Sequence, residues 1–217
     1  MSAFDLSTTR GRLGTYLHYF WFDHAYLRLA FSNAHWISEE LVRANQPWPF
    51  QVKAWRDRGI RTIVNLRHGV DAHHVLEEEA CERYGVEHTY FVVFSREVPS
   101  RGQVLGAKQL FDEIEYPAMM HCKSGADRAG LAAGLFVLFQ GGTARDALKQ
   151  LSLRFGHIRQ ARTGILDAFF HHYAREAEGQ KPFLDWVRED YDEATLRRDF
   201  HANGLASFIN DWVLVHE

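Results

Sequence analysis

The sequence predicts an α/β fold: a central, mostly parallel sheet flanked by helices, with a helical extension at the C-terminus. Two observations predict this class. Short apolar or β-branched runs alternate with helical patterns up to residue 122, and the rest of the chain carries helical patterns only. Strands separated by helices pair in parallel, because each helix carries the chain back to the end of the sheet at which the previous strand began. A chain of 217 residues can bury a core without disulfides or metals.

Each element has a local signal. The predicted strands are short runs rich in β-branched or apolar residues, at 34–47 (a short hairpin or edge strands ending at a proline turn), 61–66, 86–93 and 116–122. The predicted helices are bounded by caps or glycines, at 50–59, 73–85, 100–115, 128–140, 144–155, 161–177 and in the tail from 181. Ser100 with Gln103 forms a capping-box pattern, and Thr143 is a further N-cap.

The chain divides into three predicted parts. Residues 1–37 form an aromatic N-terminal segment packed on the domain, residues 38–180 form the domain itself, and residues 181–217 form the helical extension. The aromatic run at 15–31 is too short and too charged to cross a membrane. Two interpretations of this run stay open, which are packing on the domain and contact with a membrane surface.

The composition indicates which partners and which cellular compartment to expect. A formal net charge of -3 gives no bulk attraction to nucleic acid, so no nucleic-acid partner is expected. Two cysteines, Cys81 and Cys122, and an N-terminus unlike a signal peptide predict a reducing, cytoplasmic setting, extended to the membrane surface if the aromatic segment binds lipid. Neighbouring histidines on a helix point to different faces, so we expect no metal, and no cofactor is needed.

The stretch HCKSGADR, residues 121–128, joins a predicted strand to a predicted helix. Such a loop makes an anion-binding nest, because its backbone N–H groups converge with the positive end of the helix dipole. Arg128 adds a planar fork for two phosphate oxygens. Gly125 permits a turn that a side chain would obstruct. The same field stabilises a thiolate at Cys122, which would then be a nucleophile facing a bound phosphate.

This loop resembles the HCxxGxxR signature of the cysteine-based protein tyrosine and dual-specificity phosphatases. Upstream, RANQP, a helix and GIRTIVNLR look like the start of the compact atypical dual-specificity phosphatases, so the resemblance covers residues 38–155. It implies a dual-specificity phosphatase-like fold for the domain at 38–180 and metal-free hydrolysis of a phosphate monoester. Cys122 would form a phosphocysteine, and Arg128 with the loop amides would hold the phosphate oxygens.

By the same resemblance, His121 sets the loop through hydrogen bonds. The residues implied in binding phosphate are those that follow the nucleophile: Lys123, Ser124, Gly125, Ala126, Asp127 and Arg128.

Two positions depart from the family pattern. Ser or Thr usually follows the loop arginine and helps the thiolate to leave, but this chain has Ala129. The second step would then be slow unless Ser124 substitutes, and a phosphate-binding pseudophosphatase is the alternative function. The usual general-acid aspartate is also missing from the loop after the 86–93 strand. Glu97 stands there, either as the acid or as a solvated glutamate.

Three more residues bear on the substrate. Asp127 precedes the loop arginine, as in lipid-directed relatives such as the myotubularins, and would orient water, donate a proton or pair with Arg128. Lys123 would contact a second anionic group or remain solvated. Arg159 is a secondary substrate contact, or it only caps a helix end or pairs with an acidic residue. These residues favour a phosphorylated lipid, inositol or sugar-lipid, with phosphotyrosine protein as the alternative. Rhodanese-type sulfur transfer fits less well, because no rhodanese feature accompanies the spacing.

Overall fold

The computed structural model describes residues 4–200 of the chain. Five strands form one sheet in the order β1-β2-β5-β3-β4, in which β1 is antiparallel to β2 and every other neighbouring pair is parallel. The strands are β1 His35–Trp36, β2 Leu41–Asn45, β3 Thr62–Asn65, β4 Glu87–Tyr90 and β5 Ala118–Cys122. The predicted fold class, a mostly parallel sheet accompanied by helices, is confirmed.

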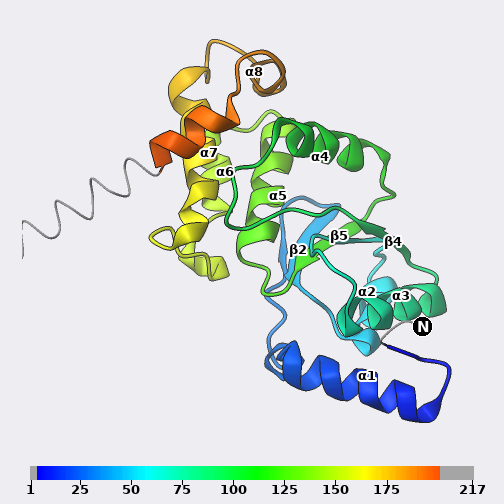
Figure 1. Cartoon of the computed structure of the whole chain (residues 1–217). Coiled ribbons are helices and arrows are strands. Elements are labelled where there is room, and N and C mark those ends of the chain that lie inside the picture. The colour runs from blue at the N-terminus through cyan, green and yellow to red at the C-terminus, as the bar shows by residue number, and fades with distance from the viewer. Residues whose placement is uncertain (1–3, 201–217) are drawn as a thin grey trace, which may run out of the picture. The chain divides into compact units, whose positions relative to one another are not determined.

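The chain forms two compact units. Unit 1 takes in residues up to 93 and residues 112–130, and unit 2 takes in residues 94–111 and those from 131 onward. Unit 1 holds the sheet, the first turn of α5 and four further elements: α1 Thr9–Phe22, the 3-10 turn η1 Ala25–Arg28, α2 Pro49–Asp57 and α3 Ala72–Tyr84. Within this unit α2 and α3 lie side by side, and α1 packs next to α3 (Figure 1).

The described part of unit 2 contains α-helices and 3-10 turns, joined by loops, and no strand. Its elements are α4 Arg101–Glu113, whose last two residues fall in unit 1, the main part of α5 Asp127–Phe139, α6 Ala144–Lys149, η2 Leu153–Phe155, η3 Arg162–Gly164, α7 Ile165–Glu176 and α8 Phe183–Glu189. A further helical stretch begins at residue 193 and continues to residue 200, the last one described. The helical extension is therefore present as far as residue 200, and the part predicted from 201 to 217 lies outside the described residues.

The core of unit 1 explains why β2, β3 and β5 are interior strands. Every residue of these three strands is buried. Their apolar side chains pack with those of α2 and α3, in a cluster that includes Val42, Val52, Trp55, Ile63, Ala80, Cys81 and Met119. Cys81 thus faces the sheet, and burial raises the pKa of its thiol, which keeps it protonated and unreactive.

Three elements differ from the sequence prediction, β2 in its position in the sheet and β4 and α6 in their extent. The predicted hairpin is present as β1 and β2, but β2 is an interior strand. β4 lies at the sheet edge and ends at Tyr90, after which the N–H groups of Phe91 and Val93 bond to the carbonyl oxygens of Asn65 and Leu66. α6 ends at Lys149 instead of extending to 155, because Ser152 is extended and starts a separate 3-10 turn. The caps predicted at Ser100 and Thr143 are formed.

The aromatic N-terminal segment has a buried side and an exposed side. Tyr19 and Ala25 are buried in a cluster with Trp48 and with α3. Large apolar side chains on the other side are exposed: Leu13, Leu17, Trp21, Phe22, Leu27, Leu29 and Phe31. Between residues 4 and 200, no helix is both long enough and apolar enough to cross a bilayer.

Candidate active site

The stretch HCKSGADR forms the strand-loop-helix unit that the sequence predicts. β5 ends at Cys122, whose residue is 2% exposed, and α5 begins at Asp127. Gly125 lies at the turn with a φ of 76°, in the left-handed region that disfavours side chains. A Cβ at this position would lie 2.7 Å from the backbone nitrogen of Asn45, on the strand beside Cys122. Glycine is therefore required by both conformation and space.

Two buried side chains hold the outer side of this loop. Arg43, on β2, donates from Nη2 to the carbonyl oxygens of Gly125 at 2.7 Å and Ala126 at 2.9 Å. Asn33, at a φ of 40°, donates from Nδ2 to the carbonyl oxygen of Ser124 at 2.8 Å. The carbonyl groups of three successive loop residues are thus bound by side chains from unit 1.

These contacts set the direction of the loop amides. In a trans peptide the C=O and N–H groups point opposite ways. Because the carbonyls of residues 124, 125 and 126 point to Asn33 and Arg43, the N–H groups of Gly125, Ala126 and Asp127 point to the other side of the loop. The Ala126 N–H makes only a long contact of 3.4 Å with the Ser124 hydroxyl. These N–H groups thus lie at the start of a 13-residue helix and point away from Asn33 and Arg43.

Arg43 also supplies positive charge beneath the loop. Its residue is fully buried at 0% exposure, and burial lowers its pKa to about 10, a shift that is partly opposed by the negative charges of Cys122 and Asp127. A group with that pKa remains charged at neutral pH. Arg43 is therefore a buried positive charge that interacts electrostatically with Cys122 and Asp127.

His121 is held by a buried carboxylate. Its Nε2 lies 2.8 Å from Oε1 of Glu77 on α3, and both residues are almost fully buried. Glu77 also accepts from Asn65 Nδ2 at 2.6 Å and lies 3.1 Å from His88 Nε2. Burial alone would raise the pKa of Glu77, but the charges and hydrogen bonds of His121 and His88 outweigh it and hold the pKa well below its ordinary value.

Asp23 links the N-terminal segment to the loop. Its carboxylate is bound by Arg28 at 2.5 Å and by Arg67 at 2.6 Å, and Nζ of Lys123 lies 3.4 Å away. Burial would raise the pKa of Asp23, but Arg67 and Arg28 lower it far more. Asp23 is therefore a fixed negative charge that positions the lysine at the rim of the loop.

No protein-family model matches the chain, and no curated protein matches it in sequence. Solved structures do match. TpbA of P. aeruginosa is 22% identical, with 74% of this chain and 95% of that chain covered and a TM-score of 0.54. A DUF442 protein of Shewanella putrefaciens, described as a candidate phosphatase, is 16% identical, with 70% and 95% covered and a TM-score of 0.56. Tk-PTP, as a glycine-to-alanine variant, is 18% identical, with 65% and 97% covered and a TM-score of 0.50.

The chain has the cysteine-phosphatase fold. The predicted site residues from His121 to Arg128 are consecutive in the sequence, and all of them lie in unit 1. Cys122, Gly125 and Ala126 are buried, Lys123, Asp127 and Arg128 are half-buried, and Ser124 is exposed.

Two predicted residues lie in unit 2. Glu97 is exposed and lines a cavity of about 620 Å³ together with Arg96 and Arg162. Arg159 donates from Nε to Oδ1 of Asp167 at 2.9 Å, although its side chain is 58% exposed. The roles of Glu97 and Arg159 toward Cys122 therefore stay predictions.

The sequence prediction missed four residues that support the loop of the cysteine-phosphatase fold: Asp23, Asn33, Arg43 and Glu77. Arg43 had a detectable signal, because it is a lone charge in a strand that is otherwise buried, where a charge requires a partner. Asp23, Asn33 and Glu77 carry no such signal, since a carboxylate or amide on a helix or in a loop is normally solvated.

Proposed function

We propose that this protein hydrolyses phosphate monoesters through a phosphocysteine on Cys122. The observation that carries the proposal is the loop itself. Asn33 and Arg43 donate hydrogen bonds to the carbonyl oxygens of residues 124–126. The amide N–H groups on the other side of the loop would then form a row of donors at a helix N-terminus. A phosphate bound there would place phosphorus in front of the Cys122 sulfur, in position for nucleophilic attack.

The first step forms the S–P bond and breaks the bond between phosphorus and the ester oxygen. The loop amides and Arg128 would hold the non-bridging oxygens while charge moves to the leaving oxygen. That oxygen requires a proton, for which Asp127 and Glu97 are the two candidates. Replacing each by its amide separates them: the true acid's variant loses most rate with poor leaving groups and little with p-nitrophenolate.

The second step transfers the phosphoryl group from sulfur to water. Ala129, fully buried in the first turn of α5, offers no hydroxyl to the departing thiolate. This favours slow phosphoenzyme hydrolysis, and its extreme form is a pseudophosphatase that binds phosphate without turnover.

For the substrate we propose a phosphorylated lipid, inositol or sugar-lipid. The exposed apolar side chains lie on the same N-terminal segment whose Asp23 contacts Lys123 of the loop. A membrane bound by this segment would bring phosphorylated head groups to the loop in a reducing, cytoplasmic setting. Phosphotyrosine protein is the alternative, since a cysteine-to-serine variant of TpbA was solved with phosphotyrosine.

Two experiments test this proposal. Rapid acid quench with an aryl phosphate, followed by peptide mass analysis, should find one added phosphoryl group on Cys122. Its absence in wild-type protein that releases phosphate would refute the intermediate. Vesicle sedimentation with Trp21→Ser/Phe22→Ser, using Leu153→Ser as an equally exposed apolar control in unit 2, tests the membrane. Equal sedimentation of the wild type and both variants would refute the membrane role.

A further inference from the structure

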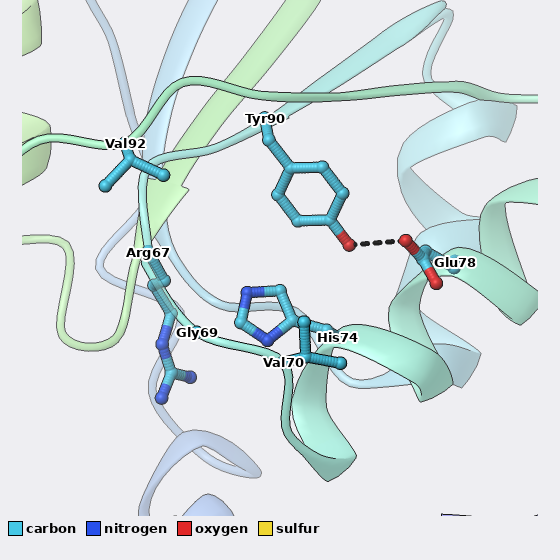
Figure 2. Close-up of a pocket in the computed structure, with 7 residues that line it drawn as sticks. All are labelled: Arg67, Gly69, Val70, His74, Glu78, Tyr90 and Val92. Atoms are coloured by element: carbon cyan, nitrogen blue, oxygen red, sulfur yellow. Dashed lines mark hydrogen bonds between the residues drawn. The ribbon is translucent and has the colours of Figure 1, made fainter. Parts of the chain in front are cut away.

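A second cavity lies at the carboxyl edge of the sheet in unit 1. It has a volume of about 240 Å³, and Figure 2 shows the seven residues that line it: Arg67, Gly69, Val70, His74, Glu78, Tyr90 and Val92. They come from the segment after β3, from α3, and from the end of β4 and the segment after it. Nothing in the proposed phosphatase mechanism uses this cavity.

Strand register places the cavity near the signature loop. Tyr90 pairs with Asn65, and Asn65 pairs with His121, the residue before the nucleophile. Neighbouring strands lie about 4.8 Å apart, so the backbone of Tyr90 is roughly 10 Å from that of His121. None of the residues that line the cavity belongs to the signature loop, residues 121–128. Ligands commonly bind outside the carboxyl ends of parallel strands.

The walls are mostly apolar. Two valine side chains and the Tyr90 ring face the space, and the Tyr90 hydroxyl is occupied by a 2.7 Å hydrogen bond to Glu78 (Figure 2). Arg67 is likewise occupied, because its guanidinium binds Asp23. Neither charged residue is left in need of an ionic ligand.

His74 is the exception among the lining residues. It is 3% exposed, and its ring lies between Tyr90 and Val70 in Figure 2. The backbone of Arg67 is a hydrogen-bond neighbour of the His74 ring. No protein group within residues 4–200 makes a hydrogen bond of full geometry to either ring nitrogen. A buried polar atom without a partner costs about 1 to 3 kcal/mol, so the ring nitrogen that does not face the Arg67 backbone favours a ligand group that pairs with it.

The charge state of His74 limits the ligand. Burial and the positive charge of Arg67 lower its pKa below the ordinary value, so the imidazole is neutral at pH 7, with one donor and one acceptor nitrogen. The Tyr90 ring, whose centroid is 5.4 Å from that of His74, offers a surface for aromatic contact. An apolar cavity of about 150 Å³ is enough for benzene, so this one has room for a substituted ring.

We propose that this cavity binds a small neutral aromatic molecule, whose hydroxyl or N–H group pairs with His74 and whose ring packs against Tyr90, Val70 and Val92. The site is separate from the phosphatase chemistry, and binding does not require Cys122 to be active. Its occupant would touch Arg67. The guanidinium of Arg67 binds Asp23, which in turn contacts Lys123 of the signature loop.

The test is an amide NMR titration of the full chain with p-cresol, a neutral phenol. We expect saturable shifts centred on Gly69, Val70, Tyr90 and Val92. Val92→Phe, at a partly exposed wall position, should fill the cavity and abolish the shifts. His74→Leu should weaken p-cresol binding at least threefold but leave toluene binding within twofold, because toluene lacks the hydroxyl. Leu153→Phe, an exposed position in unit 2, is the control and should bind like the wild type.

Shifts that do not saturate, or that centre elsewhere, would overturn the proposal in the wild type alone, whatever the variants do. Binding that survives Val92→Phe, or falls equally for p-cresol and toluene in His74→Leu, would also overturn it. Repeating the titration with Cys122→Ser separates this site from the proposed function: p-cresol should bind equally well whether or not the protein turns over phosphate esters.

Discussion

The guanidinium of Arg43 donates a hydrogen bond to the carbonyl oxygen of Gly125 at 2.7 Å. This bond joins strand β2 to the turn of the signature loop. Arg43 is fully buried, so the sheet holds the loop in shape through a charged, water-excluded hydrogen bond. This contact lets a short glycine-containing loop keep its amides facing away from Arg43 before any ligand binds.

Arg43→Met should therefore destabilise the protein and disorganise the loop. Two loop carbonyls would lose a charged donor, which predicts a decrease in the free energy of unfolding of about 2 to 4 kcal/mol. Phosphate binding should weaken at least tenfold under conditions where the variant is folded. Urea denaturation and phosphate titration measure both effects. Arg61→Met removes an arginine whose side chain is 65% exposed and should change neither.

Gly125→Ala should abolish phosphate binding. The new Cβ would meet the Asn45 backbone at 2.7 Å in a left-handed conformation, so the loop must shift. Gly141→Ala is the matched control, because Gly141 has a φ of 83° but open space around its Cβ position. The control should lose only about 1 kcal/mol of stability from backbone strain and keep full phosphate affinity. Equal loss of affinity in both variants would contradict this account of the loop.

Because of the Glu77–His121 pair, we expect the free energy of unfolding to decrease as the pH falls into the acid range. The pKa of Glu77 is lower in the folded than in the unfolded state, so its contribution is fully present above the unfolded value of about 4.3 and is lost as the pH falls below it. Glu77→Gln should be less stable than the wild type at pH 7, and the difference should narrow toward pH 3. Urea denaturation across this range measures it. Glu82→Gln, an exposed position on α3, should run parallel to the wild type.

Ala129→Ser should accelerate the second step. A hydroxyl bonded to the departing thiolate is worth about 1 to 1.5 kcal/mol, which predicts roughly tenfold faster steady-state turnover with an unchanged burst rate. Stopped-flow release of p-nitrophenol separates the two phases. A faster burst with the same steady state would mean that residue 129 does not limit phosphoenzyme hydrolysis.

Local sequence predicted much of this fold because its signals are local. The β-branched run at 61–66 and the capping pairs at Ser100 and Thr143 act on their own neighbours, and they form as expected. The signature loop is also contiguous, so His121 through Arg128 could be placed on a strand-loop-helix unit from the sequence.

The supports of the loop could not be predicted in this way. Arg43 lies 82 residues from Gly125, and the contact exists only because β2 pairs with β5, a pairing between strands that are not consecutive. Asp23 likewise reaches Lys123 only once the N-terminal segment has packed on unit 1. Such contacts depend on topology, for which the sequence pattern holds no local signal.

The most direct test of the central claim is turnover of p-nitrophenyl phosphate by purified protein in excess chelator, beside a Cys122→Ser control. We predict chelator-resistant release of p-nitrophenol, with a burst equal to the enzyme concentration followed by a slow steady rate, and no release by the serine variant. Release that persists in Cys122→Ser, or no burst and no turnover with p-nitrophenyl phosphate, phosphoinositides and phosphopeptides alike, would contradict a phosphocysteine mechanism.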